Sequence, residues 1–398
     1  MLDRFPPEIQ TDILSRLSVD DLLRFRCISK SWCAQIDDAV FIKAHLKKFF
    51  NTCSSLYLLF ADSHPNSLYF ASFESLGNAV ELDNPLKGPS DAHHNIKMVG
   101  SCNGLICYGN AAGTIALLNP LTTKHHILPF LPLDFHLEGK STWGAWAFGF
   151  GYDPISDDYK VVRLGQYLCL FDQFFDTETM VCSLKANTWR RIPGMSYVLG
   201  FDQKMGVLVG DSLHWLVGRH RIVLNPNLIV GFNLEVEEFR EVPAPELIGE
   251  NLSINLGVVG DWLSLTANYE RMRLDVWVMK EYGEEESWSR LIVIKPNELA
   301  PLKCMRTLAF SKKGDELLLR LVDGSLVWYN LKEKSVKSVE IPIAVTPFVV
   351  EAFRGSLVSP CLNKEETDAK KVRPQKGKNN RKRDEFLSKG FKLVLKWG

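Results

Sequence analysis

Apolar residues near the start of the chain recur with the spacing of an α-helix. Ile9, Ile13 and Leu17 follow at intervals of four, and Leu14 lies beside them. This pattern predicts an amphipathic helix with one apolar stripe. The Pro6–Pro7 pair suits its first turn, where a missing N–H and a fixed φ are tolerated.

Three further helices are predicted from capping residues. Ser18 precedes Asp21 with capping-box spacing, Ser29 can cap a third helix and Asp38 a fourth. Their apolar positions are Leu22, Leu23, Phe25, Ile28, Trp32, Ile36, Phe41, Ile42 and Leu46. A unit of about 46 residues buries too little surface to be stable alone, so we expect it to dock on something else.

The stretch from Phe5 to Leu46 resembles the F-box, the adaptor-binding module of Skp–cullin–F-box ubiquitin ligases. The matching blocks are Pro7-Glu8-Ile9, Ile13-Leu14-Ser15-Arg16-Leu17, Leu22-Leu23-Arg24-Phe25-Arg26 and Lys30-Ser31-Trp32. Phe5 and Ser18-Val19 depart from the common pattern but keep its local character. The alternative is a helical hairpin packed on its own domain.

The resemblance implies contact with a Skp-type adaptor, and through it with a cullin. The residues implied are Pro6, Ile9, Ile13, Leu14, Leu17, Leu22 and Leu23. Part of this set must instead form the small core of the module, because so few apolar side chains are available.

After about Phe50 the helical spacing gives way to short strands separated by Gly, Asn, Asp and Pro. A strand–turn–strand pattern ends near Leu82, Leu128, Ile192, Val242, Val293 and Ile341, at steps of 46, 64, 50, 51 and 48 residues. A period near 50 built from strands favours four-stranded propeller blades. Six markers predict six blades, and the strand Phe348–Phe353 can complete the first. The alternative is a β-sandwich or two stacked sheets.

The repeats resemble the plant F-box-associated (kelch-like) β-propeller domain. The most specific block runs from Gly151-Tyr152-Asp153 to Asp157-Asp158-Tyr159-Lys160-Val161-Val162. Asn103-Gly104 predicts a hairpin turn with positive φ. Asp157 and Asp158 suit a turn in which side chains bond the backbone, and Tyr159 begins a buried strand. These are scaffold positions.

The long step of 64 residues points to recognition loops. Asp134–Ala145 and Leu168–Thr179 exceed what a blade needs, and long loops on a rigid scaffold often carry binding. A long strand with a bulge explains the second segment equally well.

Composition limits the remaining possibilities. The 398 residues are 46% hydrophobic and carry no net charge, so no general attraction to nucleic acid or membrane is expected. The nine cysteines include no Cys-x-x-Cys pair, which fits a reducing setting. No apolar run approaches the length of a transmembrane helix.

The C-terminal end is basic. From Lys370 to Arg383, eight of 14 residues are Lys or Arg and none is acidic. Such a run predicts either a bipartite nuclear signal or a solvated linker. We therefore divide the chain into an F-box (1–46), a propeller (47–361), a basic linker (362–385) and a strand-like tail (386–398).

No catalytic, metal-binding or cofactor-binding constellation is recognised. His93-His94 and His125-His126 lack zinc-site spacing, and His214 alternates with strand residues.

The predicted fold is a small all-α F-box of three to four helices followed by an all-β propeller. The implied function is that of a non-catalytic ubiquitin-ligase receptor, in nucleus and cytoplasm, whose propeller binds a protein client. The alternative is a propeller-fold glycan-binding protein or enzyme with a helical cap.

Overall fold

The computed structural model describes most of the chain up to Cys361. The described residues are 6–50, 56–61, 67–87, 96–110, 112–132, 142–169, 174–200, 205–219, 228–247, 252–269, 273–295, 304–321, 323–341 and 349–361. The basic linker and the strand-like tail predicted above lie outside these residues, as do His93 and His94.

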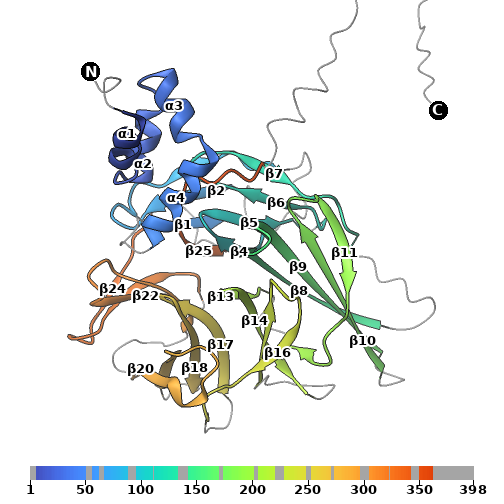
Figure 1. The fold of residues 1–398 in the computed structure, drawn as a ribbon. Helices are drawn as coiled ribbons and strands as arrows, with labels where there is room; N and C mark the ends of the chain where they lie inside the picture. The colour runs from blue at the N-terminus through green and yellow to red at the C-terminus, as the bar shows by residue number, and fades with distance from the viewer. Residues whose placement is uncertain are drawn as a thin grey trace, which may run out of the picture. The chain divides into compact units, whose positions relative to one another are not determined.

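Four short helices form the N-terminal module. They are α1 (Pro7–Leu14), α2 (Val19–Phe25), α3 (Lys30–Ile36) and α4 (Ala39–Phe50) (Figure 1). The predicted caps are confirmed. Ser18 and Ser29 accept the backbone N–H groups of Asp21 and Trp32, and Asp38 accepts those at the start of α4.

The strands form six antiparallel sheets, which we call blades 1 to 6. Blade 1 holds β25 (Val349–Arg354), β1 (Leu56–Ala61), β2 (Leu68–Ser72) and β3 (Val80–Leu82). Blade 2 holds β4 (Lys97–Cys102), β5 (Leu105–Gly109), β6 (Ile115–Leu118) and β7 (His125–Ile127). Blade 3 holds β8 (Thr142–Asp153), β9 (Asp158–Cys169), β10 (Phe174–Ser183) and β11 (Thr188–Ile192).

Blades 5 and 6 repeat the four-stranded order, and blade 4 has five strands. Blade 4 holds β12 (Val198–Leu199), β13 (Val207–Val209), β14 (Ser212–Gly218), β15 (Leu228–Asn233) and β16 (Phe239–Val242). Blade 5 holds β17 (Leu252–Val259), β18 (Trp262–Tyr269), β19 (Arg273–Met279), the short 3₁₀ helix η2 (Glu285–Ser287) and β20 (Trp288–Ile294). Blade 6 holds β21 (Cys304–Phe310), β22 (Glu316–Leu321), β23 (Leu326–Asn330) and β24 (Val336–Ser338).

The blades close into a ring, which confirms the propeller and excludes the sandwich. The late strand β25 pairs with β1 over six residues, from Leu56–Arg354 to Ala61–Val349. Separate hydrophobic clusters join each blade to the next, and one of them joins blade 6 to blade 1 through Leu318 and Leu58. Radial packing of this kind leaves few open sheet edges.

Over their described parts the predicted recognition loops are strands, so the loop prediction is wrong there and the alternative of a long strand holds for the second segment, without a bulge in its pairing. Residues 142–145 belong to β8, Leu168 and Cys169 end β9, and residues 174–179 belong to β10. The long step in the repeat arises because β8 and β9 each run for 12 residues and pair along their whole length. Residues 134–141 and 170–173 lie outside the described part of the chain.

The aspartate block of blade 3 is structural, as predicted. Asp153 accepts the backbone N–H groups of Ile155 and Ser156 and lies 2.9 Å from the Lys160 ammonium. Lys160 also reaches the backbone oxygen of Leu234, at 2.6 Å, and thereby joins blade 3 to blade 4. Burial opposes ionisation of Asp153, but the hydrogen bonds from Ser156 and Lys160 prevail and lower its pKa to about 2.

The helices pack on the propeller through apolar and polar contacts. Leu357, which follows the closing strand β25, belongs to the core of the helical module. Leu121 of blade 2 packs against the same core. The hydroxyl of Tyr57, on β1, donates to Asp20 of α2 at 2.6 Å. The module therefore has the external support that its small size requires.

Candidate functional site

The helical module divides its apolar side chains between a core and an exposed face. Leu14 and Leu22 are 1% and 0% exposed and lie in the core with Trp32 and Ile36. The core also receives Leu17, Leu23 and Phe25, which are partly buried. These contacts hold the four helices together, so the leucines of the core are not available as free surface.

Two isoleucines of α1 remain on the outside. Ile9 is 47% exposed and Ile13 is 38% exposed, and Pro6 before them is exposed as well. The structure thus divides the seven residues implied by the sequence resemblance. Pro6, Ile9 and Ile13 are accessible, Leu17 and Leu23 are half-buried, and Leu14 and Leu22 are internal.

Two more exposed apolar residues belong to the helical module. Ile28 follows α2 and Val40 lies in the first turn of α4, and both are largely exposed. Ile28 could have been found from the sequence, because it extends the apolar face of α2 beyond what one packing partner needs. The sequence did not indicate that Val40 is exposed, because the apolar residues Phe41 and Ile42 beside it were expected to face the core.

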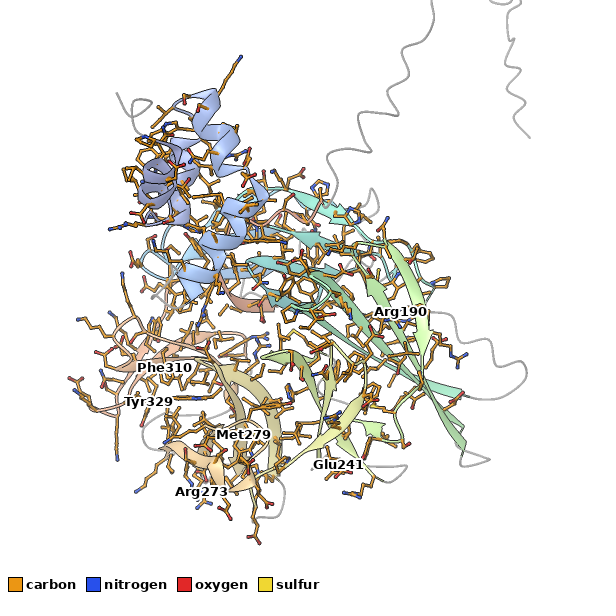
Figure 2. All side chains as sticks on the ribbon, in the orientation of Figure 1. Arg190, Glu241, Arg273, Met279, Phe310 and Tyr329 are labelled. Atoms are coloured by element: carbon orange, nitrogen blue, oxygen red, sulfur yellow. The ribbon has the colours of Figure 1, made fainter. Side chains whose placement is uncertain are left out.

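The second candidate feature is a cavity of about 1140 Å³ at the centre of the propeller. Its wall comes from the innermost strands β4, β8, β13, β17, β21 and β25 and from the turns that follow them. Apolar groups such as Phe150, Leu208, Leu308 and Phe353 form much of this wall. Phe310, which is labelled in Figure 2, lies at the end of β21 and also lines the cavity.

A short polar chain crosses the wall of the cavity. The guanidinium of Arg306 lies 2.6 Å from the Glu351 carboxylate, and the Ser101 hydroxyl donates to Glu351 at 3.4 Å. These three groups come from blades 6, 1 and 2, so they also tie the ring together where it closes. Ser101 and Arg306 occupy the two oxygens of the Glu351 carboxylate, which gives this carboxylate a structural role.

The mouth of the cavity is formed by turns on the same side as the helices. Asp211, Asp261, Glu74 and Lys312 line it, and they lie in or beside the turns after the first or third strands of their blades. The β8–β9 turn on this side also contacts α4, through Asp157. The mouth and the helical module therefore share one end of the propeller.

Tyr282 links two blades at this mouth. Its hydroxyl lies 2.7 Å from Nε2 of the fully buried His214, whose Nδ1 lies 3.0 Å from the backbone oxygen of Val207. Neutral imidazole fits this arrangement, with one nitrogen donating and the other accepting. Burial lowers the pKa of His214 to about 4. His214 is thus a strand residue, as predicted, and it is placed for packing.

The described residues offer no metal site. Among them, no three His, Cys, Asp or Glu side chains are close enough to hold a metal ion. His125 and His126 lie on the outermost strand β7, and His126 contacts Asn187. Within the same residues, no helix has the length and apolar character needed to cross a bilayer.

Comparison with protein families agrees with this architecture. Residues 2–43 match the F-box domain, and residues 55–355 match the F-box associated beta propeller domain. Four helices with an exposed apolar face, joined to a six-bladed ring, define the class of F-box proteins with a propeller. The chain belongs to the F-box-associated β-propeller family.

Individual relatives extend over almost the whole chain. F-box protein CPR1 of Arabidopsis thaliana is 36% identical, covering 98% of this chain and 99% of its own length. F-box protein At4g22390 of the same plant is 30% identical with the same coverage. Among solved structures, an oligogalacturonate lyase of Vibrio parahaemolyticus shares 14% identity over 70% of this chain and 73% of its own, with a TM-score of 0.41. A likeness of that size carries no functional argument.

An F-box with a propeller fits the role of a substrate receptor, and the F-box implies binding to a Skp-type adaptor.

Proposed function

We propose that this chain is the substrate-recognition subunit of a Skp–cullin–F-box ubiquitin ligase. In this role α1 and its neighbours bind the adaptor, and the propeller holds a protein that is to be ubiquitinated. The observation that carries the proposal is the set of exposed apolar side chains on the helical module, which remain outside a core that Leu357 of the propeller helps to complete. They are Ile9, Ile13, Ile28 and Val40.

The exposed face has the character of an interface that is covered in a complex. Fully burying an isoleucine contributes about 1.5–3 kcal/mol, and Ile9 and Ile13 are each about half exposed. A partner that covers them together with Ile28 and Val40 gains apolar contact that the chain itself does not provide. Isolated surface residues need no such explanation, but four on one small module do.

The contribution of the chain to ubiquitination is proximity. Holding a client beside the conjugating machinery raises the effective concentration of its lysines without any bond chemistry by this subunit. The packing of Leu357 and Tyr57 against the helices supports this role, because it fixes the direction in which the propeller presents its client.

The adaptor-binding face is tested by the double substitution Ile9→Asp with Ile13→Asp. Neither side chain belongs to the buried core, so the module should stay folded while a co-expressed Skp-type adaptor no longer co-purifies. Substituting Leu14 would be uninformative, because a charge at that buried position unfolds the module.

A matched control changes two equally exposed apolar residues on outermost strands of the propeller, Val80→Asp with Ile127→Asp. This variant should bind the adaptor like the unmodified chain. Full adaptor binding by the Ile9/Ile13 variant, with circular dichroism unchanged, would show that the adaptor does not use this face.

A further inference from the structure

The turns around the cavity mouth differ in charge from one blade to the next. In blades 4 and 5, the turns at 210–211, 234–238, 260–261 and 280–287 contain nine acidic residues and one lysine. We call this region the acidic sector. Its acidic residues are Asp211, Glu235, Glu237, Glu238, Asp261, Glu281, Glu284, Glu285 and Glu286. In blade 6, the corresponding turns at 311–315 and 331–335 contain four lysines and two acidic residues.

Most carboxylates of the acidic sector lack a cationic partner. Glu237 is paired with Arg190 and Lys160, Glu238 with Arg240, and Asp261 with Arg354. Within the described part of the chain, the other six have no Lys or Arg within ion-pair distance. The sector therefore keeps a negative field at the edge of the cavity, which a cationic partner would neutralise.

Aromatic and aliphatic side chains are exposed in the same turns. Trp262 is 37% exposed and follows Asp261, which lines the cavity. Tyr282 is 51% exposed and lines the cavity itself, where the bond to His214 holds its ring in place. Val236 is exposed in the blade 4 turn. Aromatic faces next to carboxylates suit ammonium and guanidinium groups as well as apolar side chains.

The cavity provides apolar surface beside these carboxylates. Leu208 and Val258 belong to its wall near the acidic sector, and the basic groups of its lining are engaged by carboxylates. Arg306 is held by Glu351, Lys312 by Glu74 and Arg354 by Asp261. Among the described residues, each lining cation is thus paired, and of the four lining carboxylates only that of Asp211 lies outside these pairs. The lining therefore offers an incoming segment mainly apolar contact, and most of the unpaired negative charge comes from the surrounding turns of the acidic sector.

We propose that the cavity mouth and the acidic sector bind a client segment in which Lys or Arg residues flank a bulky apolar side chain. The apolar side chain enters the cavity between blades 4 and 5, and the flanking cations contact the sector and the faces of Trp262 and Tyr282. This inference rests on the proposed function, since it names the class of client segment that the receptor takes. An acidic segment is repelled at the same mouth.

The test is a selection of displayed random peptides on the full-length chain held by its adaptor. Enriched peptides should be richer in Lys and Arg than the starting library and should contain a large apolar residue. One enriched peptide, made synthetically, should bind at least about tenfold more weakly to the variant Asp261→Lys with Glu284→Lys, a loss of about 1.4 kcal/mol. Raised salt should weaken binding to the unmodified chain.

The control variant Glu246→Lys with Glu340→Lys makes the same charge change after the outermost strands of blades 4 and 6. Both residues are exposed, and this variant should bind the peptide like the unmodified chain. Enrichment of acidic or uncharged peptides, no enrichment, or equal affinity for the two variants would overturn the inference. Adaptor binding is measured on the same samples, so failure of peptide binding is separate from failure of the proposed receptor role.

Discussion

The Lys43 ammonium of α4 lies 2.5 Å from a carboxylate oxygen of Asp157, in the turn between β8 and β9. The hydroxyl of Tyr152 donates to the same carboxylate, and together these two groups lower the pKa of Asp157. The contact joins the helical module directly to blade 3. Because both ionic side chains are well exposed, the pair contributes at most about 1 kcal/mol.

The larger part of the connection between helices and propeller is apolar, and it can be tested at Leu357. Leu357→Ala removes a buried side chain from the helical core and should lower the free energy of unfolding of the helices by about 2–5 kcal/mol. Hydrogen exchange should become faster in α2 to α4 and stay slow in blades 4 and 5. Lys43→Ala is the comparison and should change exchange little; equal effects of the two variants would contradict this ranking.

The link between blades 3 and 4 depends on a buried cation. Lys160 contacts Asp153 at 2.9 Å and Glu237 at 3.0 Å, and its side chain is almost fully buried. Lys160→Met leaves the buried Asp153 carboxylate without its cation, while Glu237 keeps Arg190, and should cost about 3–5 kcal/mol in denaturant unfolding. Arg240→Ala breaks the exposed pair with Glu238 and should cost less than about 1 kcal/mol. Similar losses of stability for the two variants would show that the buried Lys160 contributes no more than an exposed ion pair.

Burial of His214 predicts a dependence of stability on pH. Its folded-state pKa of about 4 lies below its ordinary value of 6.5, so between these values the unfolded state binds a proton that the folded state does not. Stability should therefore fall as pH decreases through this window, by up to about 1.4 kcal/mol per pH unit from this group. Denaturant midpoints across the window would show it, and His214→Gln should flatten the slope. If the slope of stability against pH were unchanged in His214→Gln, other groups would be responsible for the pH dependence.

Glycine at position 104 permits the close approach of the β4–β5 turn to Ser356. Gly104 has φ +79°, and a Cβ there would lie 2.2 Å from Oγ and 2.8 Å from the backbone nitrogen of Ser356. Gly210 has φ +60°, and no atom lies within 4 Å of its Cβ position. The variant Gly210→Ala therefore measures only the cost of placing alanine at a positive φ. Gly210→Ala should lose about 1–2 kcal/mol, and Gly104→Ala should lose about 1–3 kcal/mol more. Equal thermal unfolding midpoints for Gly104→Ala and Gly210→Ala would show that the contact with Ser356 adds no steric cost.

The basic run at the C-terminal end predicts nuclear import. Replacing Lys370–Arg383 with a Gly/Ser spacer of equal length should reduce the nuclear fraction of a fluorescently tagged chain, because an import signal is read by its charges. Adaptor binding provides the control, since it uses the other end of the chain. An unchanged distribution would make this run a linker.

Local signals in the sequence were enough for the secondary structure and the class of fold. Ser18, Ser29 and Asp38 cap helices where expected, and Asn103 and Gly104 take the positive φ values of a tight turn. Such signals depend on a few neighbouring residues and survive in any tertiary context. The repeat spacing gave six blades for the same reason, because each blade is a local unit.

The function of individual side chains was decided only by the tertiary structure. The stripe Ile9, Ile13, Leu14 and Leu17 is uniformly apolar in the sequence, and only the packing of α2 to α4 buries Leu14 while leaving the isoleucines outside. The loops proposed near blade 3 became long paired strands, since pairing depends on a partner strand as well as on composition. The acidic sector joins turns more than 70 residues apart, from Asp211 to Glu286, which only the packing of blade 4 against blade 5 brings to one mouth.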